Sequence, residues 1–190
     1  MIFVALLRGI NVGGKNTISM DKLKESFIKS GMQSVSTYIN SGNIIFTDTI
    51  HTKKELEELL EAAIAEDFSL EIKVLVRTLP DFELLMKFLP TRFTNDDQRK
   101  SDVLFLWEEI DGNALTEKLT LREGIDELIP VPGALIWSVD RAMVSKSGMM
   151  KLVGSAEYKK MTIRNVNTVR KLHSLMSEQK DEPSTEEIPD

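Results

Sequence analysis

The stretch VSTYINSGNIIFT, residues 35–47, decides the fold that this chain is expected to adopt. It contains two strand-like runs, 35–39 and 43–47, with Asn40-Ser41-Gly42 between them. Asparagine and glycine tolerate positive φ angles, so these three residues predict a tight β-hairpin. Two strands joined in this way are neighbours in an antiparallel sheet.

The segments on either side of this hairpin alternate between strand and helix patterns. Before it, residues 1–7 are an apolar run typical of a buried strand, and a helix follows that Ser19 caps and Gly31 ends. After it, residues 53–68 have apolar side chains at helical spacing, and residues 70–76 alternate as in a half-buried strand. The order β-α-β-β-α-β predicts a ferredoxin-like antiparallel sheet with two helices on one face.

A second α+β unit is expected in the rest of the chain. A short helix opens at Pro80 and stops at Pro90, and the polar segment TRFTNDDQRKS predicts a linker. Beyond the linker, strands are expected near residues 103–107, 127–130 and 134–139, and helices near 115–121, 147–153 and 162–176. The sequence therefore predicts an α+β protein with a ferredoxin-like subdomain at 1–90, a linker at 91–101, a second α+β subdomain at 102–176 and an acidic C-terminal tail at 177–190.

The composition excludes several kinds of functional site. The 190 residues include no cysteine, which rules out disulfides, thiol nucleophiles and cysteine-ligated metals, and only two histidines. No spaced carboxylate motif predicts a metal site, and no G-x-S-x-G elbow accompanies either histidine. We therefore expect no metal site. The sequence identifies neither a catalytic residue nor a cofactor, and whether the protein is an enzyme stays open.

The apolar runs are too short for a membrane protein. The longest, Met1 to Leu7, falls far below the ~20 residues that a membrane span needs. No basic segment precedes this run and no small-residue cleavage site follows it, so we do not expect a signal peptide. The sequence predicts a cytoplasmic protein with no membrane partner.

Charge is strongly segregated along the chain, although the net charge is only −6. Between residues 141 and 171, Glu157 is the one acid among eight basic residues, which are Arg141, Lys146, Lys151, Lys159, Lys160, Arg164, Arg170 and Lys171. This basic segment is either a surface that attracts phosphates and nucleic acid or an ordinary solvated face. The tail holds six acids and Lys180, and docking on the basic segment is one possible place for it.

The loop after the first strand partly matches a nucleotide-binding motif. Residues 9–15 fit the pattern G-x-x-x-x-G-K, but Asn16 stands where that motif needs the serine or threonine that holds magnesium. The predicted hairpin also disagrees with the parallel sheet of such enzymes. A nucleotide-triphosphate site is therefore not expected.

The same loop remains a candidate for binding a simpler anion. Backbone N–H groups beside glycine form anion-binding concavities, and an arginine grips a carboxylate or phosphate with two hydrogen bonds. The residues that would do so here are Arg8, Asn11, Gly13, Gly14 and Lys15. In the alternative interpretation, the glycines only turn the chain and Arg8 pairs with an internal acid.

The hairpin tip is a second polar cluster. Asn40, Ser41 and Asn43 offer two amides and a hydroxyl group, which suit contact with a ligand. Turn chemistry explains the same residue types, because asparagine, serine and glycine are all common in turns. Both interpretations stay open.

A third polar cluster lies near the C-terminus, at residues 162–168 with the sequence TIRNVNT. Its asparagines and threonines have low helix propensity, although the surrounding pattern predicts a helix. In a helix, Arg164, Asn167 and Thr168 would share one face. Together with Asn165, they need partners either within the fold or in a ligand.

Three motifs carry a resemblance to a known family. ALLRGINVGG at residues 5–14, YINSGN at 38–43 and T-x-R-N-x-N-T at 162–168 resemble an uncharacterised bacterial family, catalogued as a domain of unknown function. The resemblance implies a two-part α+β protein whose first part is ferredoxin-like, and it implies no activity. The family often has tryptophan between the last two asparagines, where this chain has Val166.

These observations lead to a hypothesis about function. We hypothesise that the protein binds a small anionic ligand, for example a phosphorylated one, between its two subdomains. The candidate ligand-binding residues are Arg8, Asn11, Gly13, Gly14, Lys15, Asn40, Ser41, Asn43, Arg164, Asn165, Asn167 and Thr168. Two alternatives stay open: nucleic-acid binding through residues 141–171, which would weaken steeply with salt, and a protein-interaction module without a ligand. The oligomeric state is not predicted.

Overall fold

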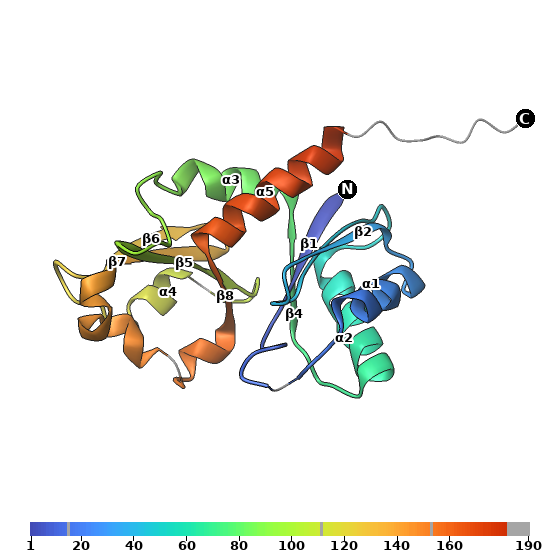
Figure 1. Ribbon diagram of the computed structural model, residues 1–190, viewed down its shortest axis with the longest axis horizontal. Helices are drawn as coiled ribbons and strands as arrows, with labels where there is room; N and C mark the ends of the chain where they lie inside the picture. The colour runs from blue at the N-terminus through green and yellow to red at the C-terminus, as the bar shows by residue number, and fades with distance from the viewer. Residues whose placement is uncertain (15, 111, 153, 182–190) are drawn as a thin grey trace, which may run out of the picture.

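The computed structural model of the chain describes residues 1–14, 16–110, 112–152 and 154–181, and it confirms the α+β class (Figure 1). The first half runs through β1 (Ile2–Leu7), α1 (Met20–Lys29), β2 (Gln33–Tyr38), β3 (Asn43–Thr47), α2 (Lys53–Phe68), β4 (Val74–Thr78) and α3 (Leu79–Phe88). Its strands pair antiparallel in the order β2-β3-β1-β4, and α1 and α2 pack together on one face. This arrangement agrees with the predicted ferredoxin-like fold.

The second half has a sheet with the same strand order as the first. It runs through β5 (Arg99–Leu106), α4 (Gly112–Thr116), β6 (Glu127–Val131), β7 (Ala134–Asp140), the 3-10 helices η1 (Arg141–Lys146), η2 (Gly148–Lys151) and η3 (Glu157–Lys160), β8 (Met161–Asn165) and α5 (Val166–Asp181). Its order, β6-β7-β5-β8, is that of the first sheet when the strands are counted from β5. The sequence predicted only that the second half is another α+β unit, whereas the two sheets repeat one topology.

The repeat extends to individual backbone contacts. In each half, the last residue of the first strand donates its N–H to the glycine that ends the hairpin turn. Leu7 donates to Gly42 O at 2.8 Å, and Leu106 donates to Gly133 O at 3.0 Å. Both glycines have positive φ, 75° and 72°, a conformation that glycine adopts without the steric cost of a Cβ atom.

The helices that follow the last strand of each half also correspond. Their buried side chains have the same spacing and lie in one hydrophobic core: Leu79, Phe82, Leu85 and Leu89 from α3 and its C-cap, and Val166, Val169, Leu172 and Met176 from α5. Val166, which replaces the tryptophan often found in the resembled family, is therefore a fully buried core residue.

That core joins the two halves into one body. It contains Val4 and Leu75 from the first sheet and Val103 and Ile136 from the second, together with the apolar faces of α3 and α5. In Figure 1, α5 runs from the second half across to the first, and it packs against β1 as well as β5. The surface between the halves is thus held in place by shared hydrophobic burial.

The start of the last helix differs from the sequence expectation. Residues 162–165 belong to β8 rather than to a helix, because they pair antiparallel with β5 and bury Thr162 and Arg164. Sheet pairing overrides the local helical periodicity here, and α5 begins at Val166.

Other boundaries are shifted by a few residues. β4 begins at Val74 rather than at residue 70, and β5 begins at Arg99, within the segment 91–101 that was expected to be a linker. The helix α5 continues to Asp181, beyond the expected start of the acidic tail. Residues 182–190 of that tail lie outside the described residues. The expectation that the tail docks on the basic segment concerns these residues and therefore also falls outside the described part of the chain.

Candidate functional site

Arg164 lies on β8 at the surface where the two halves meet, which we call the seam. Its acceptors in the first half are Asn43 Oδ1 and the backbone oxygens of Leu7 (2.8 Å), Ser41 (3.1 Å) and Gly42 (3.1 Å). Within β8 it donates to Thr162 Oγ1 at 3.0 Å and to Ile163 O at 2.9 Å. All three nitrogens have protein partners, and burial lowers the pKa of Arg164 to about 10. Arg164 therefore joins the two halves.

Arg77 occupies the matching position on β4 and reaches in the opposite direction. Its Nη2 donates to the backbone oxygens of Leu106 and Gly133, the latter at 3.3 Å. Its Nη1 donates to the carbonyl oxygen of the preceding residue, Val76, at 2.8 Å, and Arg164 Nη1 likewise donates to the carbonyl oxygen of Ile163. The two arginines thus make three matching contacts with main-chain oxygens from opposite sides of the seam, which relates the halves by an approximate two-fold axis.

Arg8 and Trp107 form a second reciprocal pair, because each follows the first strand of its half. Arg8 Nε donates to Met161 O at 3.1 Å, and Trp107 Nε1 donates to Val74 O at 3.2 Å. These acceptors are the first residues of β8 and β4, so each side chain satisfies an edge strand of the other half. Arg8 Nη2 also donates to Tyr158 O at 3.3 Å, and its guanidinium carbon lies 5.1 Å from the centre of the Tyr158 ring.

The structure brings the opening loop and the hairpin tip together through Asn11. Its Nδ2 donates to Asn40 O at 2.9 Å and to Ile18 O at 3.0 Å, while its Oδ1 accepts from Ile18 N at 2.8 Å. Asn11 has a φ of 53°, which asparagine tolerates better than most residues. Its amide therefore fixes the two loops to each other.

Asn43 is buried and belongs to the seam. Its Nδ2 donates to Tyr38 O at 3.0 Å and to Ser41 Oγ at 3.1 Å, which closes the hairpin turn. Its Oδ1 accepts from Arg164. The side chains of Asn43 and Ser41 thus take part in contacts within the protein.

The glycines of the opening loop lie on the surface. Gly13 and Gly14 are exposed, with φ angles of 60° and 75°. A Cβ atom at either position would have no heavy atom within 4 Å. Lys15, the remaining residue expected in this cluster, lies outside the described residues.

The polar residues of the closing motif have three different surroundings. Asn165 Oδ1 accepts from Thr168 N at 2.9 Å and so caps α5, as the Thr78 hydroxyl caps α3. Thr168 is buried, and Asn167 Nδ2 donates to Asn95 O at 2.9 Å. The structure therefore does not bring Asn165, Asn167 and Thr168 together on one ligand-facing surface.

A groove of about 210 Å³ opens at the seam beside Arg8. Its lining residues are Lys73, Trp107, Glu109, Ile110, Lys159 and Lys160. Arg8 fixes both lysine-bearing segments, because its backbone N–H donates to Lys73 O at 2.9 Å and its side chain donates to the residues on either side of the 159–160 pair. Three lysines against one glutamate make this groove positive, and we call it the lysine groove.

A larger groove of about 630 Å³ adjoins the lysine groove. The two share Lys73, Trp107 and Glu109, and the other lining residues of the larger one are Lys54, Glu57, Glu58, Glu61 and Glu108. A hydrogen bond from Lys73 Nζ to Glu61 at 2.7 Å raises the pKa of that lysine. Burial raises the pKa of Glu57, although its carboxylate accepts from Val76 N at 2.8 Å. We call this recess the carboxylate groove.

Comparison with known proteins identifies a family. The model of a family described as "Protein of unknown function (DUF1697)" matches residues 1–137, which cover the first half and the second half as far as β7. The chain belongs to this family. The family resemblance inferred from the three sequence motifs is therefore confirmed.

The solved structure of a similar protein agrees with the assignment of this chain to the DUF1697 family. A conserved bacterial protein, SP0830 from Streptococcus pneumoniae, is 33% identical, with a TM-score of 0.79. The alignment covers 92% of this chain and 98% of that chain, so the similarity includes both halves. The search of curated proteins found no match to this chain.

Sequence reasoning missed Trp107, Lys73 and Ile110 of the DUF1697 chain as groove residues. It counted Lys159 and Lys160 only as members of the basic segment. The available signal was the position of Trp107, which follows β5 as Arg8 follows β1. This correspondence becomes visible only when the repeated topology of the halves is known.

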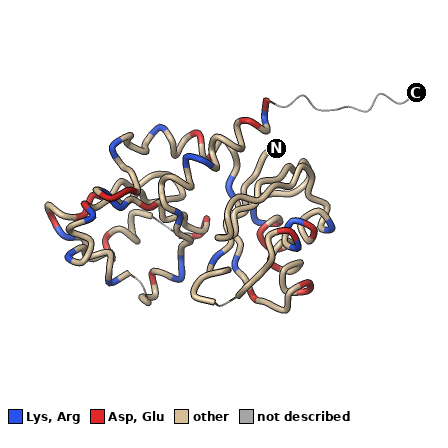
Figure 2. The backbone as a smooth tube through the Cα atoms, in the orientation of Figure 1, with Lys and Arg blue, Asp and Glu red and all other residues tan. Residues whose placement is uncertain are grey.

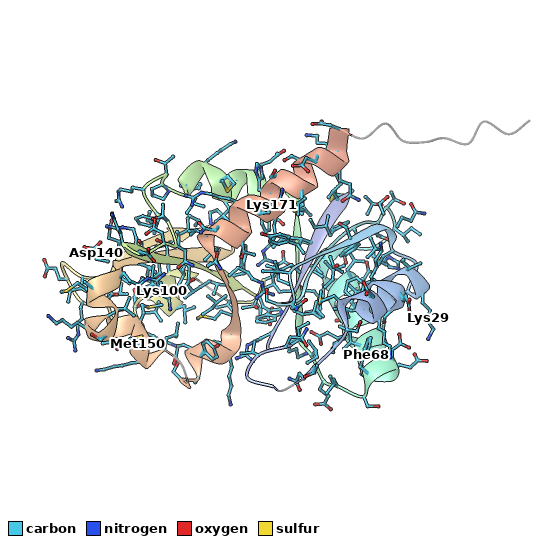
Figure 3. All side chains as sticks on the ribbon, viewed as in Figure 1. Lys29, Phe68, Lys100, Asp140, Met150 and Lys171 are labelled. Atoms are coloured by element: carbon cyan, nitrogen blue, oxygen red, sulfur yellow. The ribbon has the colours of Figure 1, made fainter. Side chains whose placement is uncertain are left out.

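The basic segment of the DUF1697 chain does not form one continuous face. Arg164 is buried in the seam, Arg170 donates to Phe93 O at 2.8 Å and to Pro90 O at 3.0 Å, and Arg141 donates to Asp96 O at 3.0 Å. Figure 2 shows the basic positions spread along the tube of the second half, and Figure 3 places Lys171 on α5, well away from η2. The positive charges of this segment are therefore distributed over several surfaces of the protein.

Two kinds of feature are absent from the residues that the structure describes. No group of three histidine, aspartate or glutamate side chains in the described residues could hold a metal ion. No helix in the same part of the chain is both long enough and apolar enough to span a membrane.

Proposed function

We propose that this protein binds a small anionic ligand, such as a phosphorylated metabolite, in the lysine groove. The observation that carries the proposal is that both halves contribute lysines to one recess beside Arg8. Ligand pockets occur preferentially at such junctions, and a recess with an excess of positive charge attracts negatively charged ligands. The proposal includes the cytoplasmic location expected from the sequence and assigns no reaction.

Lys159 and Lys160 are the main contributors of charge. Lys159 is exposed and Lys160 is half-buried, and neither forms an ion pair within the residues that the structure describes. Lys73, by contrast, is paired with Glu61. The adjacent pair can therefore donate hydrogen bonds from two ammonium groups to a phosphate or carboxylate.

Arg8 supports the proposal through a charge that no carboxylate neutralises. Its hydrogen bonds go to main-chain oxygens, and it forms no ion pair with an acid in the described part of the chain. A carbonyl acceptor leaves the full positive charge of the guanidinium in place. This proposal therefore retains Arg8 as a positive charge beside the lysine groove, while we assign Arg164, Asn43 and Asn165 to holding the fold.

The test is a binding measurement with inorganic phosphate, pyrophosphate and citrate as probes, by calorimetry and thermal shift. A ligand at about a hundred times its dissociation constant adds about 2.7 kcal/mol of stability, which raises the melting temperature of a chain of this size by several degrees. We expect the double variant Lys159→Gln/Lys160→Gln to lose most of this increase.

The matched control is Lys146→Gln/Lys151→Gln, which removes two exposed lysines from η1 and η2 outside the lysine groove. This variant should bind the probes as the wild type does. Binding that survives the Lys159→Gln/Lys160→Gln change would contradict the proposal. A short RNA serves as a further probe. If its affinity falls steeply as the salt concentration rises, and if both double variants weaken it to the same extent, the nucleic-acid alternative is favoured.

A further inference from the structure

Trp107 is shared by three recesses of the seam. It lines the lysine groove, the carboxylate groove and a third recess of about 220 Å³ on the side of Arg77. Its indole N–H donates to Val74 O, and the residue is half-buried, so these contacts restrain the orientation of the ring. A fixed indole offers a flat apolar surface to a planar group.

The two adjoining grooves that share this ring differ in their chemistry. The lysine groove is lined by Lys159 and Lys160, and the carboxylate groove is lined by Glu57, Glu58 and Glu108. Ammonium groups donate hydrogen bonds, whereas ionised carboxylates only accept them. The carboxylates alone would not define a ligand, but an indole that lines both a lysine-bearing groove and a carboxylate-bearing groove does restrict the class of ligand.

The sizes of the recesses agree with a ligand larger than a bare anion. The carboxylate groove, at about 630 Å³, lies within the range of about 300–1,000 Å³ for small-molecule pockets. The lysine groove, at about 210 Å³, is smaller. A phosphate in the lysine groove would therefore leave the adjoining volume beside Trp107 for the rest of the ligand.

We infer that the ligand is a phosphate ester with a planar ring that stacks on Trp107 and whose amino or hydroxyl groups face the carboxylate groove. A nucleoside monophosphate has this chemistry. The inference rests on the proposed function, since it requires the phosphate to bind at Lys159 and Lys160. Stacking of a base on an aromatic side chain strengthens binding by about tenfold or more.

The experiment compares adenosine 5′-monophosphate with ribose 5-phosphate, which lacks the ring, by calorimetry on the wild-type chain. We expect the nucleotide to bind about tenfold more tightly and to quench tryptophan emission, whereas ribose 5-phosphate leaves the emission unchanged. In Trp107→Leu, both ligands should bind with the affinity of ribose 5-phosphate. In Trp107→Phe, which keeps a ring but loses the indole N–H, the preference for the nucleotide should remain.

The outcomes separate this inference from the proposed function. Equal affinity of the wild type for the two ligands overturns the inference and leaves the proposed function standing. A preference for the nucleotide that persists in Trp107→Leu has the same two consequences. If neither phosphate ester binds, the inference is overturned, and if inorganic phosphate, pyrophosphate and citrate also fail to bind, the proposed function fails with it. The wild-type comparison needs no variant, so it decides the matter even if Trp107→Leu does not fold.

Discussion

Arg77 and Arg164 hold the two halves together by donating to matching main-chain oxygens in opposite directions. Each leaves the last strand of its own half and donates to the end of the first strand and to the hairpin glycine of the other half. Their acceptors across the seam are mostly main-chain oxygens, so the backbone geometry of the halves sets their relative position. Hydrogen bonds from a charged donor are stronger than those between neutral groups, and a buried acceptor that loses its donor is costly.

Replacing Arg164 with leucine should destabilise the whole molecule. The change removes a charged donor from two buried acceptors of the first half, Asn43 Oδ1 and Leu7 O, and we expect a loss of about 2–3 kcal/mol in the free energy of unfolding. Urea denaturation measures this loss. The control, Lys171→Gln, alters an exposed cation on α5 and should remain within about 0.5 kcal/mol of the wild type. Equal stability of the two variants would mean that Arg164 does not hold the seam.

Replacing Asn165 with alanine should weaken the start of α5 and leave ligand binding intact. Loss of a helix N-cap costs about 1 kcal/mol, and Thr78→Ala should have a similar effect on α3. Asn165→Asp keeps the acceptor and should be nearly neutral. If Asn165→Ala instead abolished phosphate binding without a change in melting temperature, Asn165 would be a ligand residue rather than a cap.

Replacing Gly42 with alanine should be far more damaging than the same change at Gly13. Both glycines have positive φ, which costs a residue with a Cβ atom about 1–2 kcal/mol. At Gly42 the new Cβ would also lie 2.8 Å from Leu7 Cβ and from Ile10 Cδ1, whereas at Gly13 it would meet nothing within 4 Å. Thermal unfolding of the two variants measures the difference. Comparable melting temperatures of the two variants would show that the hairpin turn accommodates the Cβ atom without a loss of stability.

Replacing Glu57 with glutamine should change the pH dependence of stability. Burial raises the pKa of Glu57 in the folded chain above its usual value of 4.5, so ionisation favours the unfolded chain as pH rises above that value. The glutamine side chain keeps an oxygen for the Val76 N–H and carries no charge. We therefore expect Glu57→Gln to gain stability relative to the wild type between pH 4 and pH 7.

Urea unfolding at pH 4, 5.5 and 7 tests this expectation. Glu58→Gln is the matched control, because Glu58 is the exposed neighbour on the same helix. Its difference from the wild type should vary little over this range. If the stability of Glu57→Gln relative to the wild type instead fell as the pH rises, the result would contradict the effect assigned to burial.

The fold of the first half could be predicted because its signals are local. The hairpin at Asn40-Ser41-Gly42 and the periodic segments around it indicate element types without knowledge of distant contacts. The same reasoning fails at residues 162–165, where a helical pattern gives way to β8 because β5 supplies a partner strand. Pairing between segments about sixty residues apart leaves no trace in a local pattern.

The candidate site could be predicted only in part. Arg8 was identified because a cation beside glycines has recognisable chemistry, and the lysine groove lies next to it. Arg164 was selected as a member of the polar cluster at residues 162–168, but residue type does not reveal whether a guanidinium faces a ligand or six acceptors of its own protein. Trp107 was overlooked because its place beside the grooves depends on the packing of one half against the other.

The sequence by itself determined the α+β class, the ferredoxin-like order of the first half and the family. These depend on turn chemistry, on apolar periodicity and on motifs within short stretches of chain. The tertiary structure alone decided that the second sheet repeats the first, that Arg77 and Arg164 join the halves, and that lysines from both halves meet beside Trp107. The physical reason is that burial of a shared apolar core brings together residues far apart in the chain, and only in that arrangement do their charges and hydrogen bonds acquire partners.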